Sequence, residues 1–471
     1  MKRIPTGLLG LTAIALALVA CITSQVPAIR QSLIYGERFI WNVHALPGST
    51  RDVVVGNVAL SGSEDTRLNF VTRLSSNGQL LWETPSMIAP ENKPVIALSA
   101  DVVIVAFNTQ LTALAARDGT AQWSVKLSGR MGFCDTCLLI VGDRVVAYSD
   151  KALEGFDLAT GKRIWSQRIP RNVPILQPAG AWLAVALPQT INLYQPADGK
   201  VALQIPAQCE GSPRAGLPRD ISPILLGNAG NNDLFVRLDT CVQRWDLQAG
   251  KRAWDVAFSK DKLGQLGNFK GFLRRKQSEM AQAGAHVFVS TGESLQQKAP
   301  RGLMVIDTAS GEARSLVTSD EHYLIPIATV GQDVLVRVKQ FRGATFDELW
   351  SINIATGKRN WLFKPDKLSD WDVLVTPSAQ GLSLALIQFG SRDTTEQVRP
   401  FLTRAIRSDV VVQVLNPQTG TPTELAPVRM QLADANWIEA TQDASVSTLF
   451  LNFGTLYAID LKTLERAYQW P

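Results

Sequence analysis

The sequence reads GKRIW at residues 161–165, GKRAW at 250–254 and GKRNW at 357–361. A segment that recurs in this way is more typical of a structural unit than of an active site, since an enzyme needs its nucleophile only once. The glycine of this motif returns throughout the chain, and a ninth, degraded copy at 460–470 has Leu464 in its place. The eight glycines are Gly78, Gly119, Gly161, Gly199, Gly250, Gly311, Gly357 and Gly420.

The copies follow one another at intervals of mostly 38 to 51 residues, which rise to about 60 where extra sequence intrudes. Short runs of β-branched and apolar residues precede each turn, and another run such as RIWSQRI follows it. Four such runs per copy, bounded by Gly, Asp and Asn, predict four antiparallel strands. A period of this length with strands around the turn predicts an all-β fold, a β-propeller.

The motif has a physical explanation as a hairpin between two outer strands. Glycine takes the positive φ that a tight turn requires. Tryptophan follows four residues later, where its ring is expected to lie over the neighbouring blade, and the exposed Lys or Arg discourages edge pairing. The alternative is that the indoles form a ligand cage. The tryptophans are Trp82, Trp123, Trp165, Trp254 and Trp361.

Composition narrows the classes of function. The chain has 471 residues, 46% of them hydrophobic and 19% charged, which is a globular balance. The formal net charge of +5 includes Lys2 and Arg3 of a predicted leader, and this weak charge gives no reason to expect a nucleic-acid partner. The three histidines, His44, His286 and His322, lack metal-ligand spacing, so we expect no metal site.

The N-terminus predicts export. Lys2 and Arg3 precede an apolar run that is too short for a comfortable transmembrane helix, as in a secretory signal peptide. The run ends in LVAC at 18–21, which resembles a bacterial lipobox and implies acylation of Cys21. An ordinary signal peptide with a chance cysteine is the alternative. The predicted division is a signal peptide at 1–20, a lipidated linker at 21–38 and one propeller domain at 39–471.

Four cysteines remain after Cys21, and an even number in an oxidising compartment predicts disulfides. They are Cys134, Cys137, Cys209 and Cys241. The CDTC segment at 134–137 precedes an apolar strand pattern and not a helix, which favours a structural bridge over a redox pair. A second bridge between Cys209 and Cys241 is plausible, although spacing does not fix the pairing.

The copies GFDLATGKRIW, RWDLQAGKRAW and SINIATGKRNW resemble the pyrroloquinoline-quinone-type propeller repeat over about residues 40–470. That family includes quinoprotein dehydrogenases and non-catalytic propellers. With the lipobox, the chain is similar to the propeller lipoproteins of the outer-membrane β-barrel assembly machine. This resemblance implies eight blades, whereas the sequence has nine cassettes. Eight is the expected number if the two ends share a closing blade.

The resemblance favours a scaffold over an enzyme. A quinoprotein dehydrogenase needs a calcium site and a cofactor in the central channel, and many have adjacent cysteines, which this sequence lacks. Its carboxylates recur at equivalent positions before the turns, where they are expected to accept hydrogen bonds from the turn backbone. We therefore expect no catalysis and no cofactor. These carboxylates belong to Asp157, Asp246, Asp307 and Asp460.

Three insertions interrupt the repeats, at about 259–300, 339–348 and 390–409. The second and third fall between the second and third strands of their cassettes, and loops on one face of a propeller would form a binding rim. The first is basic and is interpreted either as a solvated loop or as a contact for a partner or an anionic membrane. Its candidate binding residues are Lys270, Arg274, Arg275 and Lys276.

The sequence therefore predicts a non-catalytic scaffold for envelope protein assembly. The expected partners are an envelope complex, the β-barrel assembly machine, and the bilayer that holds acylated Cys21. In the lipoprotein families that the LVAC segment resembles, a residue other than Asp after the cysteine, here Ile22, favours sorting to the outer membrane, so the resemblance implies a location on its periplasmic face. The alternative is a quinoprotein-like dehydrogenase or a small-ligand sensor that uses the propeller channel.

Overall fold

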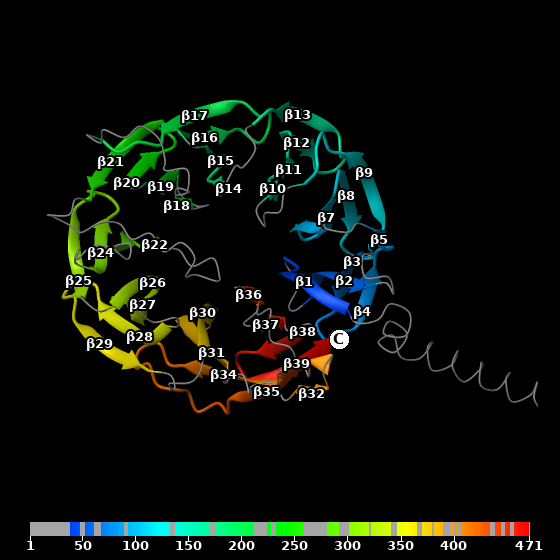
Figure 1. Cartoon of the computed structure of the whole chain (residues 1–471). Coiled ribbons are helices and arrows are strands. Elements are labelled where there is room, and N and C mark those ends of the chain that lie inside the picture. Colours follow the sequence, from blue (N-terminus) through cyan, green and yellow to red (C-terminus); the bar gives the residue numbers. More distant parts are fainter. Residues whose placement is uncertain are drawn as a thin grey trace, which may run out of the picture.

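The computed structural model is an all-β ring in which radial sheets follow one another around a common axis (Figure 1). It describes residues 38–47, 52–60, 67–88, 93–131, 137–169, 175–187, 189–210, 224–227, 232–238, 240–258, 280–291, 301–319, 322–340, 346–364, 370–378, 381–389, 397–399, 402–403, 407–433, 439–443, 448–452 and 456–470. Within these residues no helix is long and apolar enough to cross a membrane.

The first three blades follow directly from the first three cassettes. Blade 1 contains β1 (Arg38–Ala45), β2 (Val53–Leu60), β3 (Arg67–Leu74) and β4 (Leu80–Glu83), with β5 (Met87–Ile88) beside β3. Blade 2 contains β6 (Val95–Leu98), β7 (Val102–Phe107), β8 (Gln110–Ala115) and β9 (Ala121–Lys126). Blade 3 contains β10 (Leu138–Val141), β11 (Arg144–Tyr148), β12 (Leu153–Asp157) and β13 (Arg163–Gln167).

The next three blades have the same order. Blade 4 contains β14 (Ile175–Ala179), β15 (Trp182–Ala186), β16 (Thr190–Tyr194) and β17 (Val201–Pro206). Blade 5 contains β18 (Ile224–Gly227), β19 (Asp233–Arg237), β20 (Cys241–Asp246) and β21 (Lys251–Ala257). Blade 6 contains β22 (Met280–Ala283), β23 (His286–Thr291), β24 (Arg301–Asp307) and β25 (Ala313–Ser319).

The last three blades complete the ring. Blade 7 contains β26 (His322–Val330), β27 (Asp333–Gln340), β28 (Phe346–Asn353) and β29 (Arg359–Phe363). Blade 8 contains β30 (Asp370–Ser378), β31 (Gly381–Phe389), β34 (Arg407–Leu415) and β35 (Val428–Ala433), with the hairpin β32 (Gln397–Arg399) and β33 (Leu402–Thr403) between its second and third strands. Blade 9 contains β36 (Glu439–Asp443), β37 (Thr448–Asn452), β38 (Leu456–Asp460) and β39 (Glu465–Trp470).

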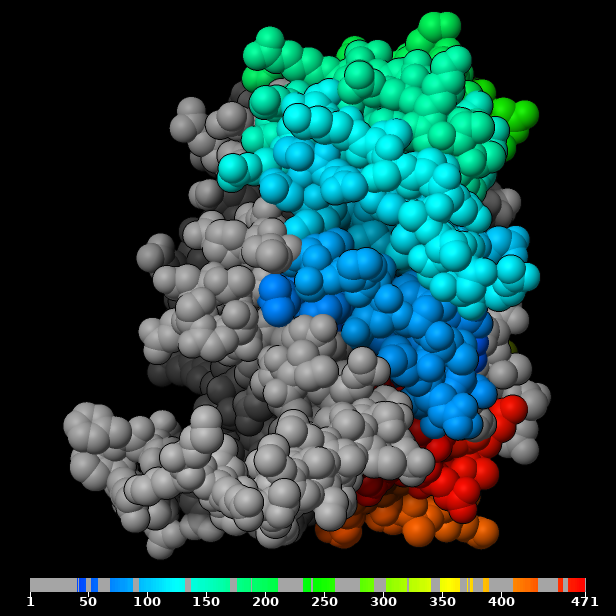
Figure 2. Space-filling view, turned by 90° about the vertical axis from the view of Figure 1, so that its right-hand side faces the viewer, coloured from blue at the N-terminus to red at the C-terminus, as the bar shows by residue number. Residues whose placement is uncertain are grey.

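The propeller has nine blades and not the eight that the family resemblance implies. Each of the nine cassettes forms its own four-stranded antiparallel sheet within the described residues, so the chain has no shared closing blade. The ring closes by packing between β1–β4 and β36–β39, because Ile40 and Val53 share a hydrophobic core with Phe450 and Tyr468. Figure 2 shows the blue first blade against the red last blade.

The antiparallel register gives the ring two different ends. At one end, which we call the turn end, hairpins join the first strand of each blade to the second and the third strand to the fourth. In blade 3, Val141, Arg144 and Asp157 are paired at this end. The opposite connection end carries the links between strands two and three and between successive blades. The chain enters blade 1 at this end, because Arg38 pairs with Ala59 near the end of β2.

The turn glycines adopt the conformation that the motif predicts. All eight have positive φ, between 63° at Gly250 and 78° at Gly78. In the ninth copy Leu464 adopts φ of 55°, so a residue with a side chain is held in the left-handed region that favours glycine. Its side chain is buried in the core shared by blades 8 and 9, and this burial offsets the backbone cost.

Each motif tryptophan covers the turn of the following blade. A Cβ added to Gly199 would lie 2.5 Å from the ring of Trp165, and the indole nitrogen of Trp165 donates to the carbonyl of Pro196 at 2.8 Å. Only glycine allows so close an approach by the ring. Trp82, Trp123, Trp254 and Trp361 have the same relation to Gly119, Gly161, Gly311 and Gly420, and each donates to the carbonyl three residues before that glycine.

Tyr468 stands in place of the motif tryptophan where the last blade meets the first. It lies four residues after Leu464, and its ring is 2.7 Å from the position of a Cβ added to Gly78 in blade 1. A ligand cage would require the indoles to meet, whereas here they are distributed over successive seams. Six of the nine seams between blades are therefore covered by an aromatic ring of the earlier blade.

We call the contact between a motif tryptophan and the turn of the following blade the clasp. Truncation of a clasp tryptophan should cause a large loss of stability. Trp165→Ala removes a side chain that is 7% exposed, together with its hydrogen bond to Pro196, so the unfolding free energy should fall by about 3–5 kcal/mol. The adjacent Ile164 is 42% exposed, so Ile164→Ala should change stability by less than about 0.5 kcal/mol. Denaturant unfolding of both variants measures the difference. Equal losses would contradict the clasp.

A second pair of variants separates backbone strain from the ring contact. Gly142 has φ of 60° with nothing within 4 Å of an added Cβ, whereas Gly199 has φ of 70° beneath the Trp165 ring. Gly142→Ala should cost about 1–2 kcal/mol for the left-handed backbone alone. Gly199→Ala should cost clearly more, because the indole must also move. Thermal melts of the two variants test this, and indistinguishable midpoints would show that the ring does not press on the turn.

Candidate functional site

The repeat carboxylates, which are the natural candidates for catalysis, lie in the turns. Asp157 accepts hydrogen bonds from the Thr160 backbone and hydroxyl at 3.0 and 2.8 Å, and Asp307 accepts equivalent bonds from Ser310. Asp246 and Asp460 accept backbone bonds from Ala249 and Lys462 at 2.8 Å. These side chains belong to four different blades at the turn end, so they do not converge on one site.

These hydrogen bonds shift the ionisation of the turn carboxylates. The hydroxyl and backbone N–H of Thr120 hold the pKa of Asp118 at about 2. Hydrogen bonds from Thr160 and Ser310 likewise place the pKa values of Asp157 and Asp307 below their usual range. The cause is local turn geometry. A charged carboxylate is the better acceptor for the N–H groups that the turn points at it.

The shifted pKa of Asp118 predicts an acid dependence of stability. A depressed folded-state pKa contributes stability above the unfolded pKa of about 3.9, and this contribution is lost as the pH falls towards 2. Asp118→Asn keeps an acceptor but cannot titrate; Asn77 stands at the same position before Gly78 and accepts from the Gln79 backbone. Its melting temperature should therefore fall less between pH 4 and pH 2 than that of the wild type. Parallel pH profiles for the two proteins would contradict this assignment.

The connection end is the candidate binding surface, because the insertions leave the ring there. The second and third insertions lie between strands two and three of blades 7 and 8, where the structure narrows them to 341–345 and 390–406. The predicted insertion at 259–300 is two separate connections, since 280–291 forms β22 and β23. The alternating apolar pattern of β22 and β23 is flanked by polar sequence, so these two strands could not be recognised from the sequence alone. Lys270, Arg274, Arg275 and Lys276 lie outside the described residues, as does Cys21.

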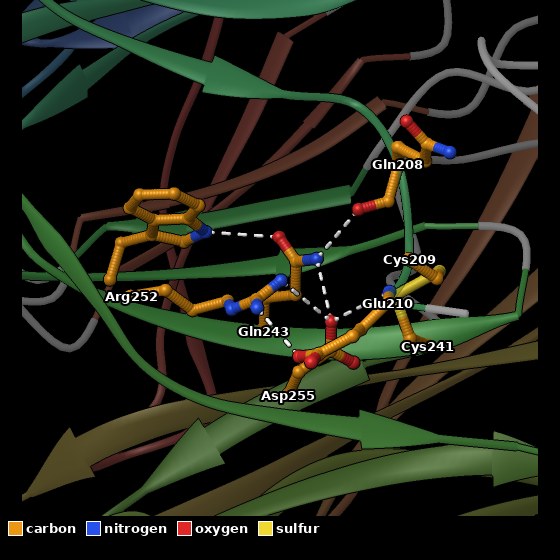
Figure 3. Close-up of a disulfide and its surroundings, with 8 residues drawn as sticks. Gln208, Cys209, Glu210, Cys241, Gln243, Arg252 and Asp255 are labelled. Atoms are coloured by element: carbon orange, nitrogen blue, oxygen red, sulfur yellow. Dashed lines mark hydrogen bonds and ion pairs between the residues drawn. A yellow bond between two sulfur atoms is a disulfide. The ribbon is translucent and has the colours of Figure 1, made fainter. Parts of the chain in front are cut away.

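A buried polar cluster at this end joins blades 4 and 5 (Figure 3). The Gln243 amide donates to the Gln208 carbonyl and to Asp255, both at 3.0 Å, while its oxygen accepts the Trp245 indole N–H at 3.0 Å. Gln243 is fully buried. Arg252 bridges Asp255 at 3.1 Å and Glu210 at 2.6 Å. The segment that leaves blade 4 is thereby fastened to two strands of blade 5.

The cysteines occupy the same end. Cys209, three residues after β17, forms a disulfide with Cys241, the first residue of β20. Cys137 is also disulfide-bonded, while Cys134 lies outside the described residues. The second of the two plausible bridges is thus present in the structure, and it connects neighbouring blades.

Blade 3 holds its incoming segment with a buried carboxylate, and blade 7 has a half-buried carboxylate that bonds within its own blade. Glu154 is fully buried and accepts hydrogen bonds from the Ser128 backbone and hydroxyl at 2.9 and 2.8 Å, and its third partner is Arg163 at 2.8 Å. In blade 7, Glu348 accepts from Trp350 at 2.7 Å and from Lys364 at 3.1 Å. Burial disfavours the charge of Glu348, but these donors outweigh burial and lower its pKa.

Glu154 and Gln243 stand three residues before the turn Asp of their cassettes, at Asp157 and Asp246. This equivalence is the signal that sequence reasoning missed, since the position is polar in some blades and apolar in others. Met304 occupies it in blade 6. Among the described residues no group of three or more His, Cys, Asp or Glu side chains is placed to hold a metal ion. At the connection end, buried polar side chains thus hold the segments that enter blades 3 and 5.

Comparison with known proteins agrees with the repeat pattern. A protein-family model described as outer membrane protein assembly factor BamB matches residues 67–217, which hold β3 to β17. The predicted resemblance to the pyrroloquinoline-quinone-type repeat family, close to BamB, is confirmed by this match. No curated protein matches the chain.

Three solved structures are similar to this chain at low identity. BamB from Moraxella catarrhalis is 14% identical, with 75% of this chain and 96% of that chain covered at a TM-score of 0.40. Dihydro-heme d1 dehydrogenase NirN in complex with DHE is also 14% identical, with coverages of 84% and 79% and a TM-score of 0.45. A eukaryotic initiation factor is 9% identical, with coverages of 92% and 97% and a TM-score of 0.47.

Proposed function

We propose that this chain is a lipid-anchored, non-catalytic propeller that serves as a scaffold for the assembly of outer-membrane β-barrel proteins. The observation that carries the proposal is the BamB family match over residues 67–217. The LVAC segment supports it, because acylation of Cys21 would place the propeller on the periplasmic face of the outer membrane.

The geometry supports a binding role at the connection end. The chain enters blade 1 there, and the second and third strands of blades 7 and 8, which flank the second and third insertions, end and begin at the same end. A tether and binding loops on one face would keep a membrane-embedded partner within reach. At the other end, the repeat carboxylates are engaged by their own turns, which favours a scaffold over a quinoprotein-like enzyme.

The anchor predicts a change of compartment in one variant. Wild-type protein should fractionate with membranes and carry acyl chains on its N-terminal peptide, while Cys21→Ala should appear in the soluble periplasmic fraction. Mass spectrometry of the mature N-terminus and membrane fractionation measure this. An unmodified wild-type N-terminus would show that the signal peptide is an ordinary one.

The scaffold role predicts a specific partner. Affinity purification of the full-length lipidated chain from detergent-solubilised native envelopes should recover the barrel-inserting subunit of the β-barrel assembly machine. Purified protein mixed with pyrroloquinoline quinone and calcium should show neither an absorbance shift nor dye reduction. Stoichiometric cofactor binding with dye reduction would overturn the scaffold in favour of a dehydrogenase. Binding without turnover would favour a ligand sensor.

A further inference from the structure

The seam between blades 4 and 5 lacks the aromatic clasp. Leu203 stands four residues after the turn glycine of blade 4, at the position of Trp165 in blade 3. An added Cβ on Gly250 would find only the Leu203 side chain, at 4.0 Å, whereas the corresponding ring lies 2.5 Å from Gly199. The turn of blade 5 is therefore not covered by a ring.

Leu203 also differs from the clasp residues in its partner across the hairpin. Trp123 is paired with Ala113 and Trp165 with Gly155, whereas Leu203 is paired with Leu193. Arginines stand opposite Trp82 and Trp254, so a large partner does not by itself exclude a ring. The seam between blades 4 and 5 therefore has a pair of leucines where blades 2 and 3 have a ring beside a small residue.

The other two seams without a ring have non-covalent substitutes. Between blades 6 and 7, Arg314 donates to the Ile354 carbonyl, and only residues 320–321 separate the adjoining strands. Between blades 8 and 9, Met430 and Leu464 pack in one hydrophobic core. The seam between blades 4 and 5 differs from both, because it is crossed by a covalent bond.

That bond lies at the connection end of the same outer strand. Cys209 lies three residues after β17, in the segment that leaves blade 4, and Cys241 is the first residue of β20 in blade 5. We propose that the Cys209–Cys241 disulfide takes the place of the missing ring, so that reduction of the two cysteines weakens this seam and leaves it to the Gln243 cluster and the shared hydrophobic core. The seam is then the redox-sensitive opening point of the ring. This inference concerns the fold alone and is independent of the proposed function.

The reaction needs a dithiol reductant of the thioredoxin type. One thiolate of the reductant attacks the Cys209 sulfur, which is the more exposed of the pair at 7% against 0%, and Cys241 leaves as a thiolate. The second reductant thiol resolves the mixed disulfide and releases Cys209. Two electrons pass to the protein, the reductant becomes a disulfide, and the two protein thiolates take up protons. The Gln208 and Glu210 contacts to blade 5 must open before this attack.

Hydrogen exchange of the full-length protein tests the proposal. In Cys209→Ala/Cys241→Ala, and in reduced wild type, peptides from β17, β20 and β21 should exchange at least about ten-fold faster than in oxidised wild type. Peptides from β9 and β12, on either side of the Trp123 clasp, should not change. Cys134→Ala/Cys137→Ala is the matched control and should leave the seam between blades 4 and 5 protected.

A rescue variant separates a local seam from general instability. Adding Leu193→Ala and Leu203→Trp to the cysteine-free protein copies the Ala113 and Trp123 pair and should restore protection of β17 and β20. Unchanged exchange after loss of the disulfide would overturn the proposal, as would failure of this rescue. Faster exchange in all nine blades of the reduced wild type would also overturn it, because the disulfide would then hold the whole fold and not one seam.

Discussion

The contact on which this ring depends is an aromatic side chain laid over the turn of the next blade. It requires two features at once: a ring on the outermost strand of one blade and a residue without a Cβ at the turn of the next. Trp165 and Gly199 meet this requirement with a ring contact and a hydrogen bond to the turn backbone. Because one blade can supply the ring for one neighbour and the turn for the other, the same arrangement closes six of the nine seams.

This arrangement explains how nine blades form a ring without a shared sheet. Tyr468 of the last blade covers Gly78 of the first, so the closure repeats the contact used elsewhere in place of a special one. The core of Ile40, Val53 and Phe450 fills the space beneath it. The polar anchors at the connection end act differently. Glu154 and Gln243 fix the segments that enter blades 3 and 5.

Much of the fold could be predicted from the sequence because the repeat is local. The Asp or Asn, the glycine and the tryptophan all lie within one hairpin, so their spacing reports the turn, its left-handed residue and the direction of the indole. Even Leu464, which breaks the motif, was aligned correctly by its neighbours and has the positive φ of a glycine. The number of blades was predicted less well than the turns. The family resemblance implied eight blades, whereas the structure has nine, which is the number of cassettes counted in this chain.

The candidate site could be predicted only in part. Turn glycines and tryptophans depend on local sequence, whereas the Gln243 cluster joins residues from two blades through side chains of unrelated type. The partner of Cys209 was likewise open, because spacing does not report which strand ends face one another across a seam. The basic residues at 270–276 lie outside the described residues, so their predicted binding role remains a prediction.

The most direct measurement of the central claim is hydrogen exchange of a Tyr468→Ala variant, since this residue alone carries the clasp at the point of closure. If aromatic rings hold the seams, exchange should accelerate in β1–β4 and β36–β39, while the blades on the far side of the ring keep their protection. Unchanged protection of the first and last blades in this variant would contradict the account.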